Sequence, residues 1–410
     1  MRILYINHYA GSPKYGMAFR PFYLAKEWQN EGHVVSIVGA DNSHLRKSQP
    51  SVPNDLWEEI FDDVKYIWLK TPKYSSTGFQ RILNILSFVL KLMFYANRIS
   101  KRIKPDVVIA SSTYPLDIYP AYLIAKKSKA KLVFELHDMW PLSPIIIGGY
   151  SKYHPFIWIM QRAENFACKK SNGYVSMLGN AEEYLIEHGL KPGKFVHVTN
   201  GFLEEEWNNC SSTIPETHRT LIESIRSKKK VIIGYAGGHA PSNTLDVLIE
   251  AASELINTNI EIVLVGNGPV KNDLINLVKN KNLNNVHFLP PVNKVEIPEL
   301  LENFDILFIG GVKSKLHHYG TAANKLTDYM LAKKPIIFAV DEPKSLVEKV
   351  KCGIQIPAED KLRLIEAIQI LSKTTEDKLR DMGTKGREYA LKELNYKVLA
   401  KKFLSAIESF

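Results

Sequence analysis

Short apolar runs alternate with longer amphipathic stretches through the first half of the chain. The runs have the length and composition of buried strands, and the stretches between them carry apolar residues at helical spacing. Strands are expected over residues 2–7, 34–38, 106–111, 131–135, 173–177 and 195–199. Helices are expected over residues 21–31, 119–127 and 156–171. This alternation predicts βαβ units and a parallel sheet, the pattern of an α/β fold.

The second half repeats the pattern after a polar, lysine-rich stretch at residues 208–230, which is typical of a domain boundary. A strand, a glycine-rich loop and a helix are expected within residues 231–252. Further strands are expected within 260–269, 286–292 and 304–309, and a last helix over 396–407. A chain of 410 residues is long for one core, so two domains are expected. We place them at 1–205 and 206–390, followed by a C-terminal helical segment at 391–410.

The segment of greatest chemical interest is YGTAANKLTDYMLAKKPII, residues 319–337. It predicts a turn at Gly320 and Thr321, with Thr321 as a helix N-cap, and then a helix and a buried strand. A helix N-terminus binds anions, and Lys325 in the first turn adds a full positive charge. Asp328, one turn later, can accept hydrogen bonds from the vicinal diol of a ribose. The segment predicts a nucleotide diphosphate site, although an ordinary capped surface helix gives the same pattern.

Two other loops carry candidate chemistry. Gly237 and Gly238 follow an expected strand and permit close approach of a phosphate. His137 and Asp138 follow the strand at 131–135, at the carboxyl end where open parallel sheets place their ligands. A histidine that is only hydrogen-bonded at a strand end would produce the same sequence.

The 319–337 segment resembles the matching segment of glycosyltransferase family 4, especially the branch that builds bacterial O-antigens and capsules. The resemblance covers nearly the whole chain and implies the GT-B fold, in which two Rossmann-like, doubly wound domains face each other across a cleft. It also implies that the last helix crosses back to the first domain. The family's Glu-x7-Glu signature puts its second acid on Asp328 and its first on Gly320, which offers no side chain. The arginine and lysine that the broader family uses on the diphosphate fall on Gly238 and Asn243, so Lys325 is expected to supply the lost charge.

The resemblance implies roles for residues in both domains. His137 and Asp138 are the expected catalytic residues, with His137 lining the donor-sugar pocket. Gly16 is expected to let the backbone approach donor or acceptor, and Arg20 to reach an anionic group, unless Arg20 is only a helix-surface arginine. The donor-binding set is Gly16, Arg20, Gly237, Gly238, His239, Gly266, Gly268, Gly320, Thr321, Asn324, Lys325 and Asp328, with weaker candidates at Lys313, Lys315, His317 and His318.

A basic, apolar stretch spans residues 79–104 and contains no aspartate or glutamate. It is expected to be too short and too interrupted to cross a bilayer, but a basic amphipathic helix can lie in the headgroup layer of an anionic membrane. A buried helix with a basic end in water would explain the same residues. The expected membrane or acceptor contacts are Arg81, Lys91, Arg98, Lys101 and Arg102.

Composition supports a soluble protein with anionic partners. The net charge is +10, from 53 basic and 43 acidic residues, which favours nucleotides or lipid headgroups. The three cysteines, Cys168, Cys210 and Cys352, form no metal-type pair and fit free thiols in the cytoplasm. The N-terminus shows no secretory signal. The expected location is the cytoplasm, peripheral to the cytoplasmic face of the inner membrane.

The expected function is a retaining glycosyltransferase of bacterial surface polysaccharide synthesis. It would move a sugar from a nucleotide-sugar, with UDP as the expected nucleotide, to a glycan or a polyprenyl-diphosphate-linked acceptor. No Asp-x-Asp occurs in the sequence, and neither a metal nor another cofactor is expected. Two alternatives stay open, a nucleotide-sugar 2-epimerase of the same fold and a catalytically degenerate membrane-associated scaffold. An NAD enzyme is disfavoured because the first loop is not GxGxxG, and no RNA-binding signature points to nucleic acid.

Overall fold

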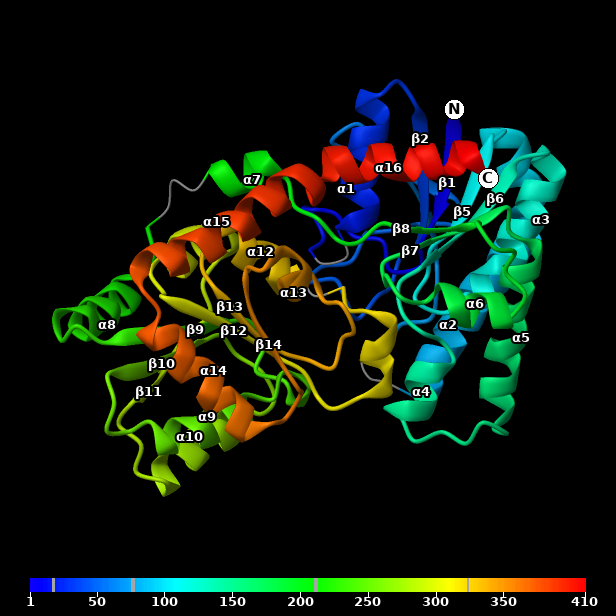
Figure 1. Ribbon diagram of the computed structural model, residues 1–410. Helices are drawn as coiled ribbons and strands as arrows, with labels where there is room; N and C mark the ends of the chain where they lie inside the picture. Colours follow the sequence, from blue (N-terminus) through cyan, green and yellow to red (C-terminus); the bar gives the residue numbers. More distant parts are fainter. Residues whose placement is uncertain (17–18, 75–77, 210–212, 323) are drawn as a thin grey trace. The chain divides into compact units, whose positions relative to one another are not determined.

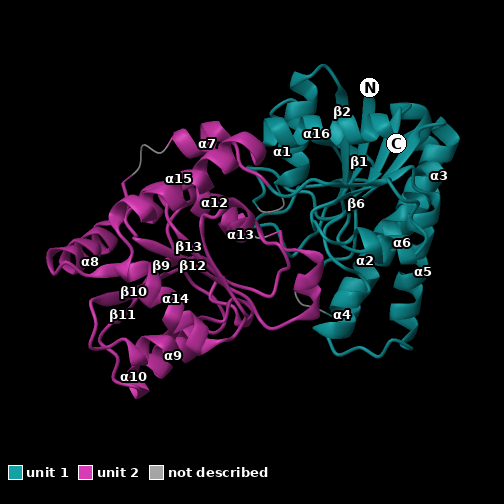
Figure 2. Ribbon diagram, viewed as in Figure 1, with its two compact units in different colours: residues 1–200, 396–410 teal, residues 201–395 magenta. Residues whose placement is uncertain are grey.

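The computed structural model describes residues 1–410 except 17–18, 75–77, 210–212 and 323. The chain divides into two compact units (Figure 2). Unit 1 contains Met1–Asn200 together with Tyr396–Phe410, and unit 2 contains Gly201–Asn395. Each unit is built on its own sheet with helices on both faces, so each has the doubly wound α/β form (Figure 1).

Unit 1 contains an eight-stranded sheet in the order β3-β4-β2-β1-β5-β6-β7-β8. All neighbouring strands are parallel except β3 and β4. The strands are β1 (Arg2–Ile6), β2 (Val34–Ala40), β3 (Trp57–Phe61), β4 (Val64–Leu69), β5 (Val107–Ala110), β6 (Lys131–Leu136), β7 (Gly173–Ser176) and β8 (Phe195–His197). The order reverses at β1, which has β2 on one side and β5 on the other, and such a switch point is where open sheets bind ligands.

The antiparallel pair β3–β4 is a feature that the sequence analysis missed. Its two-residue loop is Asp62-Asp63, and both residues have positive φ, 49° and 64°. Positive φ at both central positions is the geometry of a type I′ turn, which matches the twist of a tight hairpin. The paired aspartates between two apolar runs were the available signal.

The helices of unit 1 cover both faces of its sheet. Their bounds are α1 (Arg20–Asn30), α2 (Phe79–Ile103), α3 (Ile118–Ser128), α4 (Leu142–Ile146), α5 (Pro155–Lys170), α6 (Glu182–Glu187) and α16 (Tyr396–Ser409), with a short 3-10 turn η1 (Pro115–Asp117). Helix α3 packs against α2 and α5. The β1–β2 and β5–β6 connections step in opposite directions, so right-handed crossovers place α1 and α3 on opposite faces.

The last helix, α16, belongs to unit 1 because it packs along α1. The Trp28 indole donates to the Ala400 carbonyl at 3.1 Å, and the Trp28 and Phe403 rings meet edge to face at 5.1 Å. Tyr23 and Tyr396 also pack, with ring centroids 4.9 Å apart. These buried aromatic contacts hold the C-terminus of the chain on the first unit.

Unit 2 contains a six-stranded parallel sheet in the order β11-β10-β9-β12-β13-β14. The strands are β9 (Val231–Ala236), β10 (Ile260–Val265), β11 (Val286–Leu289), β12 (Ile306–Gly310), β13 (Ile336–Ala339) and β14 (Gly353–Ile356). The order reverses between β9 and β12, which is the switch point of this unit. The two ends of the unit are adjacent, because the Phe202 N–H donates to the Leu394 carbonyl at 3.1 Å and Phe202 pairs with Asn395.

Helices cover both faces of the second sheet, and side chains alternate between them along β9. Ile232 and Ala236 pack toward one core, and Ile233 and Tyr235 toward the other. The helices are α7 (Glu204–Asn208), α8 (Glu216–Ser227), α9 (Leu245–Glu254), α10 (Lys271–Asn280), α11 (Ile297–Glu302), α12 (Asn324–Leu331), α13 (Leu346–Val350), α14 (Lys361–Lys373) and α15 (Glu376–Glu393), with 3-10 turns η2 (Pro241–Asn243), η3 (Lys294–Glu296) and η4 (Lys315–Tyr319).

Candidate active site

The loop that follows β9 lies at the switch point of unit 2 and is packed against Lys325. A Cβ atom on Gly237 would lie 2.3 Å from Lys325 Cε, so a side chain at this position would displace the end of the lysine. Gly237 also has a φ of +154°, which L side chains rarely adopt. The Tyr235 hydroxyl donates to the Gly238 carbonyl at 2.6 Å, and the Asn243 amide donates to the same carbonyl at 2.9 Å. The structure therefore brings the glycine-rich loop and the first turn of α12 together, although they are far apart in sequence.

The Lys325 ammonium has neutral neighbours. Its Nζ donates to the Asn243 Oδ1 at 3.2 Å and lies 5.5 Å from the centroid of the Tyr235 ring. Burial lowers the pKa of Lys325, and the charge of Asp328 acts in the opposite direction. A partly desolvated cation held by neutral groups is well suited to an anionic ligand.

Asp328 lies one turn along the same helix and is partly buried. Burial raises its pKa to about 6, while the charges of Lys294 and Lys325 act to lower it. The carboxylate is therefore mostly ionised at neutral pH and becomes protonated in mildly acidic solution. An ionised carboxylate can accept two hydrogen bonds from a diol.

Gly266 and Gly268 serve a packing role between two loops. A Cβ on Gly266 would lie 1.9 Å from the Gly237 carbonyl oxygen, and one on Gly268 would lie 2.3 Å from the His239 carbonyl oxygen. The His239 N–H donates to the Asn267 carbonyl at 2.9 Å, which joins the loops directly. These glycines shape the site by letting the protein backbone approach itself.

His239 is fully buried beside this loop contact. Burial lowers the pKa of His239 to about 4, with a further lowering by Lys271, so the ring is neutral at physiological pH. Neither ring nitrogen has a hydrogen-bond partner among the described residues. Because its side chain is buried, the structure does not support the expected direct contact of His239 with a donor.

The turn before α12 differs from the sequence prediction. The described helix begins at Asn324, residue 322 is not helical, and residue 323 lies outside the described residues. Thr321 is therefore not the helix N-cap, and that prediction is wrong. Thr321 instead donates its hydroxyl hydrogen to the Glu342 carboxylate at 2.5 Å. Gly320 has a φ of +107°, a conformation that glycine adopts without strain. Asn324 itself is exposed at the helix start.

In unit 1, two polar side chains of the candidate site lie at the end of strand β6: Glu135 is on the strand, and His137 is the first residue after it. They are two positions apart and therefore point to the same face of the sheet. Glu135 is fully buried, while the His137 side chain is 14% exposed. The His137 Nε2 lies 3.1 Å from Glu135 Oε2 and 2.8 Å from the Ser111 hydroxyl. His137 thus stands at the carboxyl end of its strand, as the sequence indicated, on a fixed polar support.

Arg20 does not reach toward an external anion, which corrects the sequence expectation. It is buried, and its Nε donates to Glu135 Oε1 at 2.8 Å. Its Nη1 and Nη2 donate to the carbonyls of Thr199 and Val198, at 2.5 and 2.8 Å. The burial of Glu135 would raise its pKa, but the Arg20 charge and the hydrogen bonds from its neighbours hold that pKa below the usual range.

Gly16 also has a structural role. Its φ is +75°, and it pairs with Ser12 across a tight turn. A Cβ at this position would lie 3.0 Å from Cγ of Lys47, so the protein's own side chain fills the space expected for a ligand. The expected approach of donor or acceptor to Gly16 is therefore not supported by the structure.

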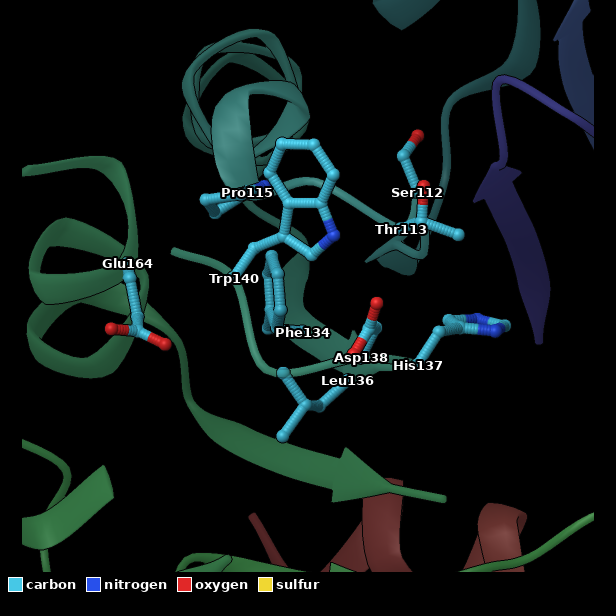
Figure 3. A pocket seen from close by; sticks show the side chains of 9 residues that line it. All are labelled: Ser112, Thr113, Pro115, Phe134, Leu136, His137, Asp138, Trp140 and Glu164. Atoms are coloured by element: carbon cyan, nitrogen blue, oxygen red, sulfur yellow. The ribbon is translucent and has the colours of Figure 1, made fainter. Parts of the chain in front are cut away.

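A cavity lies beside the loop that follows β6 (Figure 3), with about 220 Å³ of empty space that is partly open to solvent. Figure 3 shows the His137 ring pointing away from Trp140 and Phe134 in this cavity. Burial raises the pKa of Glu164 to about 7. The cavity is lined by Ser112, Thr113, Pro115, Phe134, Leu136, His137, Asp138, Trp140 and Glu164.

Asp138 acts locally. Its Oδ1 accepts from the Met139 N–H at 2.8 Å and from the Ser143 hydroxyl at 2.6 Å. These bonds fix the chain where it turns into α4. This oxygen is already used by the protein, so the structure gives Asp138 a positioning role in the loop.

Helix α2 has one buried and one exposed apolar face. Ile85, Phe88 and Leu92 are buried in unit 1. Phe79, Leu90 and Phe94 are 72%, 62% and 78% exposed, and the other large exposed apolar side chains of the helix are Leu83, Leu86 and Met93. With 25 residues it is about 37 Å long, and it is apolar enough to cross a bilayer, so the expectation that it is too short is wrong. Its buried face shows that it packs as part of unit 1.

The basic residues of α2 divide into paired and exposed groups. Lys91 pairs with Asp55 at 3.0 Å, and Arg102 pairs with Glu58 at 2.7 Å. Arg81 is within 3.4 Å of the Tyr9 hydroxyl. Arg98 and Lys101 are exposed on the last turns of the helix. Arg102 is exposed as well as paired, with 41% of its side chain accessible, so all three residues at this end of the helix face the surface, and their contact with a membrane stays a prediction.

The cysteines that the structure describes are buried and free. Burial raises the pKa values of Cys168 and Cys352 to about 12, so both are unreactive thiols. Cys210 lies outside the described residues. Among the described residues, no group of three His, Cys, Asp or Glu side chains could hold a metal ion.

Sequence reasoning missed the residues that support His137. Glu135, Ser111 and Tyr5 come from three neighbouring strands and are brought together by the sheet. Tyr5 donates its hydroxyl hydrogen to Glu135, as Ser111 does. The only available signal was a glutamate within an otherwise apolar strand run, where an unpaired charge is disfavoured.

Two family matches and one curated relative bear on identity. The family "Glycosyltransferase Family 4" matches residues 16–205, and "Glycosyl transferases group 1" matches residues 219–389. The chain is 22% identical over 286 residues to the "Putative colanic acid biosynthesis glycosyl transferase WcaI" of Escherichia coli K12, covering 68% of this chain and 69% of the relative.

Solved structures show the same fold. HepE of Anabaena, in complex with UDP, has a TM-score of 0.68 at 15% identity, and the match covers 100% of both chains. WaaG, a glycosyltransferase involved in lipopolysaccharide biosynthesis, has a TM-score of 0.63 at 16% identity, covering 98% of both chains. One family match lies in each half of the chain, and both agree with the fold of these solved structures. The protein therefore belongs to the family 4 glycosyltransferases, which have the GT-B fold.

Proposed function

We propose that this glycosyltransferase uses a UDP-sugar as donor and transfers the sugar with retention at the anomeric carbon. The observation that carries the donor proposal is the position of Lys325, a partly buried cation with neutral partners against the glycine-rich loop at the switch point of unit 2. UDP as the nucleotide is supported by HepE, whose structure contains it. Retention rests on the family resemblance alone.

The donor diphosphate is assigned to Lys325, the N-terminus of α12 and the loop of Gly237 and Gly238. Lys325 supplies a localised positive charge, and helix and loop N–H groups supply hydrogen bonds to phosphate oxygens. As the bond to the sugar breaks, negative charge grows on the leaving diphosphate, and a fixed cation stabilises that charge more than the ground state. Asp328 is assigned to the ribose hydroxyls and His137 to the sugar.

The acceptor is proposed to be a lipid-linked glycan at the cytoplasmic membrane face. The supporting observation is the exposed apolar face of α2, which ends in the exposed cations Arg98 and Lys101. Apolar side chains can enter the headgroup layer while cations meet anionic lipids. WcaI is named for colanic acid biosynthesis, which supports polysaccharide synthesis as the setting.

Nucleotide binding is tested by thermal shift with UDP, GDP, ADP, CMP and NAD⁺. A ligand at about 100 times its dissociation constant adds about 2.7 kcal/mol to stability, enough to raise the unfolding midpoint by several degrees. We expect UDP to stabilise the wild type and to have no effect on Lys325→Ala or Asp328→Ala. The matched controls Lys378→Ala and Asp273→Ala change exposed residues of the same unit and should keep the shift.

The outcomes separate the alternatives. A stabilisation by UDP that survives in both site variants would show that the nucleotide binds elsewhere. The absence of a shift with every nucleotide would refute the donor assignment and favour a scaffold without donor binding. If the protein converts a UDP-sugar to its 2-epimer in the absence of an acceptor, the reaction is epimerisation and not sugar transfer.

A further inference from the structure

The Ser111 hydroxyl lies between the Glu135 carboxylate and the His137 ring. Its Oγ is 2.5 Å from Glu135 Oε2 and 2.8 Å from His137 Nε2. The Asn7 side-chain amide also donates to Ser111 Oγ, at 3.1 Å. Three polar groups thus converge on one hydroxyl, which has one hydrogen to donate and two lone pairs.

The positions of the hydrogens follow from the partners. Glu135 is ionised beside Arg20 and can only accept, so the short contact with Ser111 requires the hydroxyl hydrogen to point at Glu135. The Asn7 amide occupies one lone pair of Ser111. The remaining lone pair faces His137 Nε2, which must therefore carry a hydrogen. Glu135 Oε2, 3.1 Å from the same nitrogen, accepts from it as well.

When His137 is neutral it carries only one ring hydrogen, so with that hydrogen on Nε2 the Nδ1 atom has a free lone pair. In the described part of the chain, no hydrogen-bond partner occupies Nδ1, and the side chain is 14% exposed. The buried edge of the ring is fixed as a donor, and the opposite edge is an acceptor.

We propose that Glu135 is a positioning residue that, through Ser111, holds His137 as the Nε2–H tautomer, so that Nδ1 accepts a hydrogen bond from a substrate hydroxyl. The identity of that hydroxyl as one of the sugar rests on the proposed function, whereas the tautomer does not. Arg20 completes the arrangement, because it keeps Glu135 ionised and joins it to the carbonyls of Val198 and Thr199.

The tautomer is measured without any substrate. Nitrogen-15 NMR of histidine-labelled protein at about pH 9, where histidines of ordinary pKa are neutral, reports which ring nitrogen is protonated. The His137→Gln variant identifies the signal of His137 among the 12 histidines. We expect Nε2 protonated and Nδ1 unprotonated, and a protonated Nδ1 in the wild type would overturn the proposal.

Glu135→Gln should invert the tautomer. The glutamine oxygen would turn to Arg20, and its NH2 group would donate to Ser111, so the serine hydrogen would then point at His137 Nε2 and Nδ1 would become protonated. Tyr5→Phe removes another donor to the same carboxylate without touching His137, and should leave the tautomer unchanged. If the two variants change the tautomer of His137 equally, and circular dichroism shows that both proteins are folded, the role of Glu135 is refuted. If Glu135→Gln does not fold, a protonated Nδ1 in the wild type would still refute the proposal.

Activity provides the second measurement. We expect Glu135→Gln to lower kcat by about tenfold to a hundredfold, as for other residues that orient a functional histidine, with the affinity for UDP alone unchanged. The surface variant Arg2→Met is the control for activity. A wild-type Nε2–H signal in a protein that transfers no sugar would refute the proposed function and leave the positioning of His137 established.

Discussion

The buried pair of Arg20 and Glu135 gives a quantitative prediction for the stability of unit 1. Arg20→Met keeps most of the side-chain volume but leaves Glu135 as a buried charge without its cation, and it also leaves the carbonyls of Val198 and Thr199 without their donors. Removing one partner of a buried ion pair costs about 3–5 kcal/mol. For a unit of this size, that loss lowers the unfolding midpoint by roughly 10 °C.

Urea unfolding followed by tryptophan fluorescence measures this loss in the right unit. Of the six tryptophans, Trp207 alone lies in unit 2, and the others are Trp28, Trp57, Trp68, Trp140 and Trp158. The matched control is Arg2→Met, which breaks an exposed pair with Asp106 whose side chains are 47% and 44% accessible. An exposed pair contributes about 0–1 kcal/mol, so the control should unfold nearly as the wild type does.

A double-mutant cycle tests whether the cause is the unpaired charge. Glu135→Gln in the Arg20→Met background removes the orphaned carboxylate, so the double variant should be less destabilised than the sum of the two single changes. If Arg20→Met lowered the free energy of unfolding by less than about 1 kcal/mol, as the Arg2 control should, the reasoning would be refuted. If the effects of the two single variants were additive, Arg20 would stabilise unit 1 only through the carbonyls it binds.

Three further predictions concern charge. Asp328 has a folded pKa of about 6, above its unfolded value, so its contribution to stability is most favourable below the unfolded pKa and is lost as the pH rises through 6. In thermal unfolding, Asp328→Asn should therefore stabilise unit 2 by up to about 3 kcal/mol at pH 8 and by less at pH 4. An equal gain in stability at the two pH values would contradict the raised pKa. The double variant Arg98→Glu, Lys101→Glu should bind anionic liposomes at least about 30-fold more weakly, at about 1 kcal/mol per charge. The control Lys378→Glu should bind as the wild type does, and unchanged binding of the double variant would refute membrane binding through α2. EDTA should leave transferase activity intact, and loss of activity that Mg²⁺ or Mn²⁺ restores would overturn metal independence.

The sequence predicted the local structure around the candidate donor site better than its tertiary contacts. Lys325 and Asp328 could be found because their spacing on one helix and their place after a strand are local patterns. Arg20 could not be assigned, because an arginine at a helix start has the same sequence whether its partner is a ligand or Glu135, 115 positions away. The same limit applies to the glycines at positions 16, 266 and 268. A glycine predicts that another group comes close to the backbone, but the sequence does not say whether that group is a side chain such as Lys47, another loop or a ligand.

Secondary structure was predictable where the apolar pattern was strong. The long apolar helix α2 and most strands of both sheets follow their periodicity, but β3, β4 and β14 were missed. Their runs are short, and polar or charged residues interrupt them, such as the two glutamates of β3 and Lys65 of β4. The network of Tyr5, Ser111 and Glu135 joins β1, β5 and β6, and strand order is a property of the sheet that no single segment encodes.

The adjacent ends of unit 2 make the protein modular. Because Phe202 is hydrogen-bonded to Leu394, the whole of unit 2 is one continuous insertion whose entry and exit share a point. Unit 1, in contrast, is completed only when residues 396–410 return to α1. A cut at this point would release unit 2 as one uninterrupted polypeptide, and a short linker from Asn200 to Tyr396 would close unit 1 on itself. Recombination at the same point can replace unit 2 by another domain while every core contact within unit 1 stays in place.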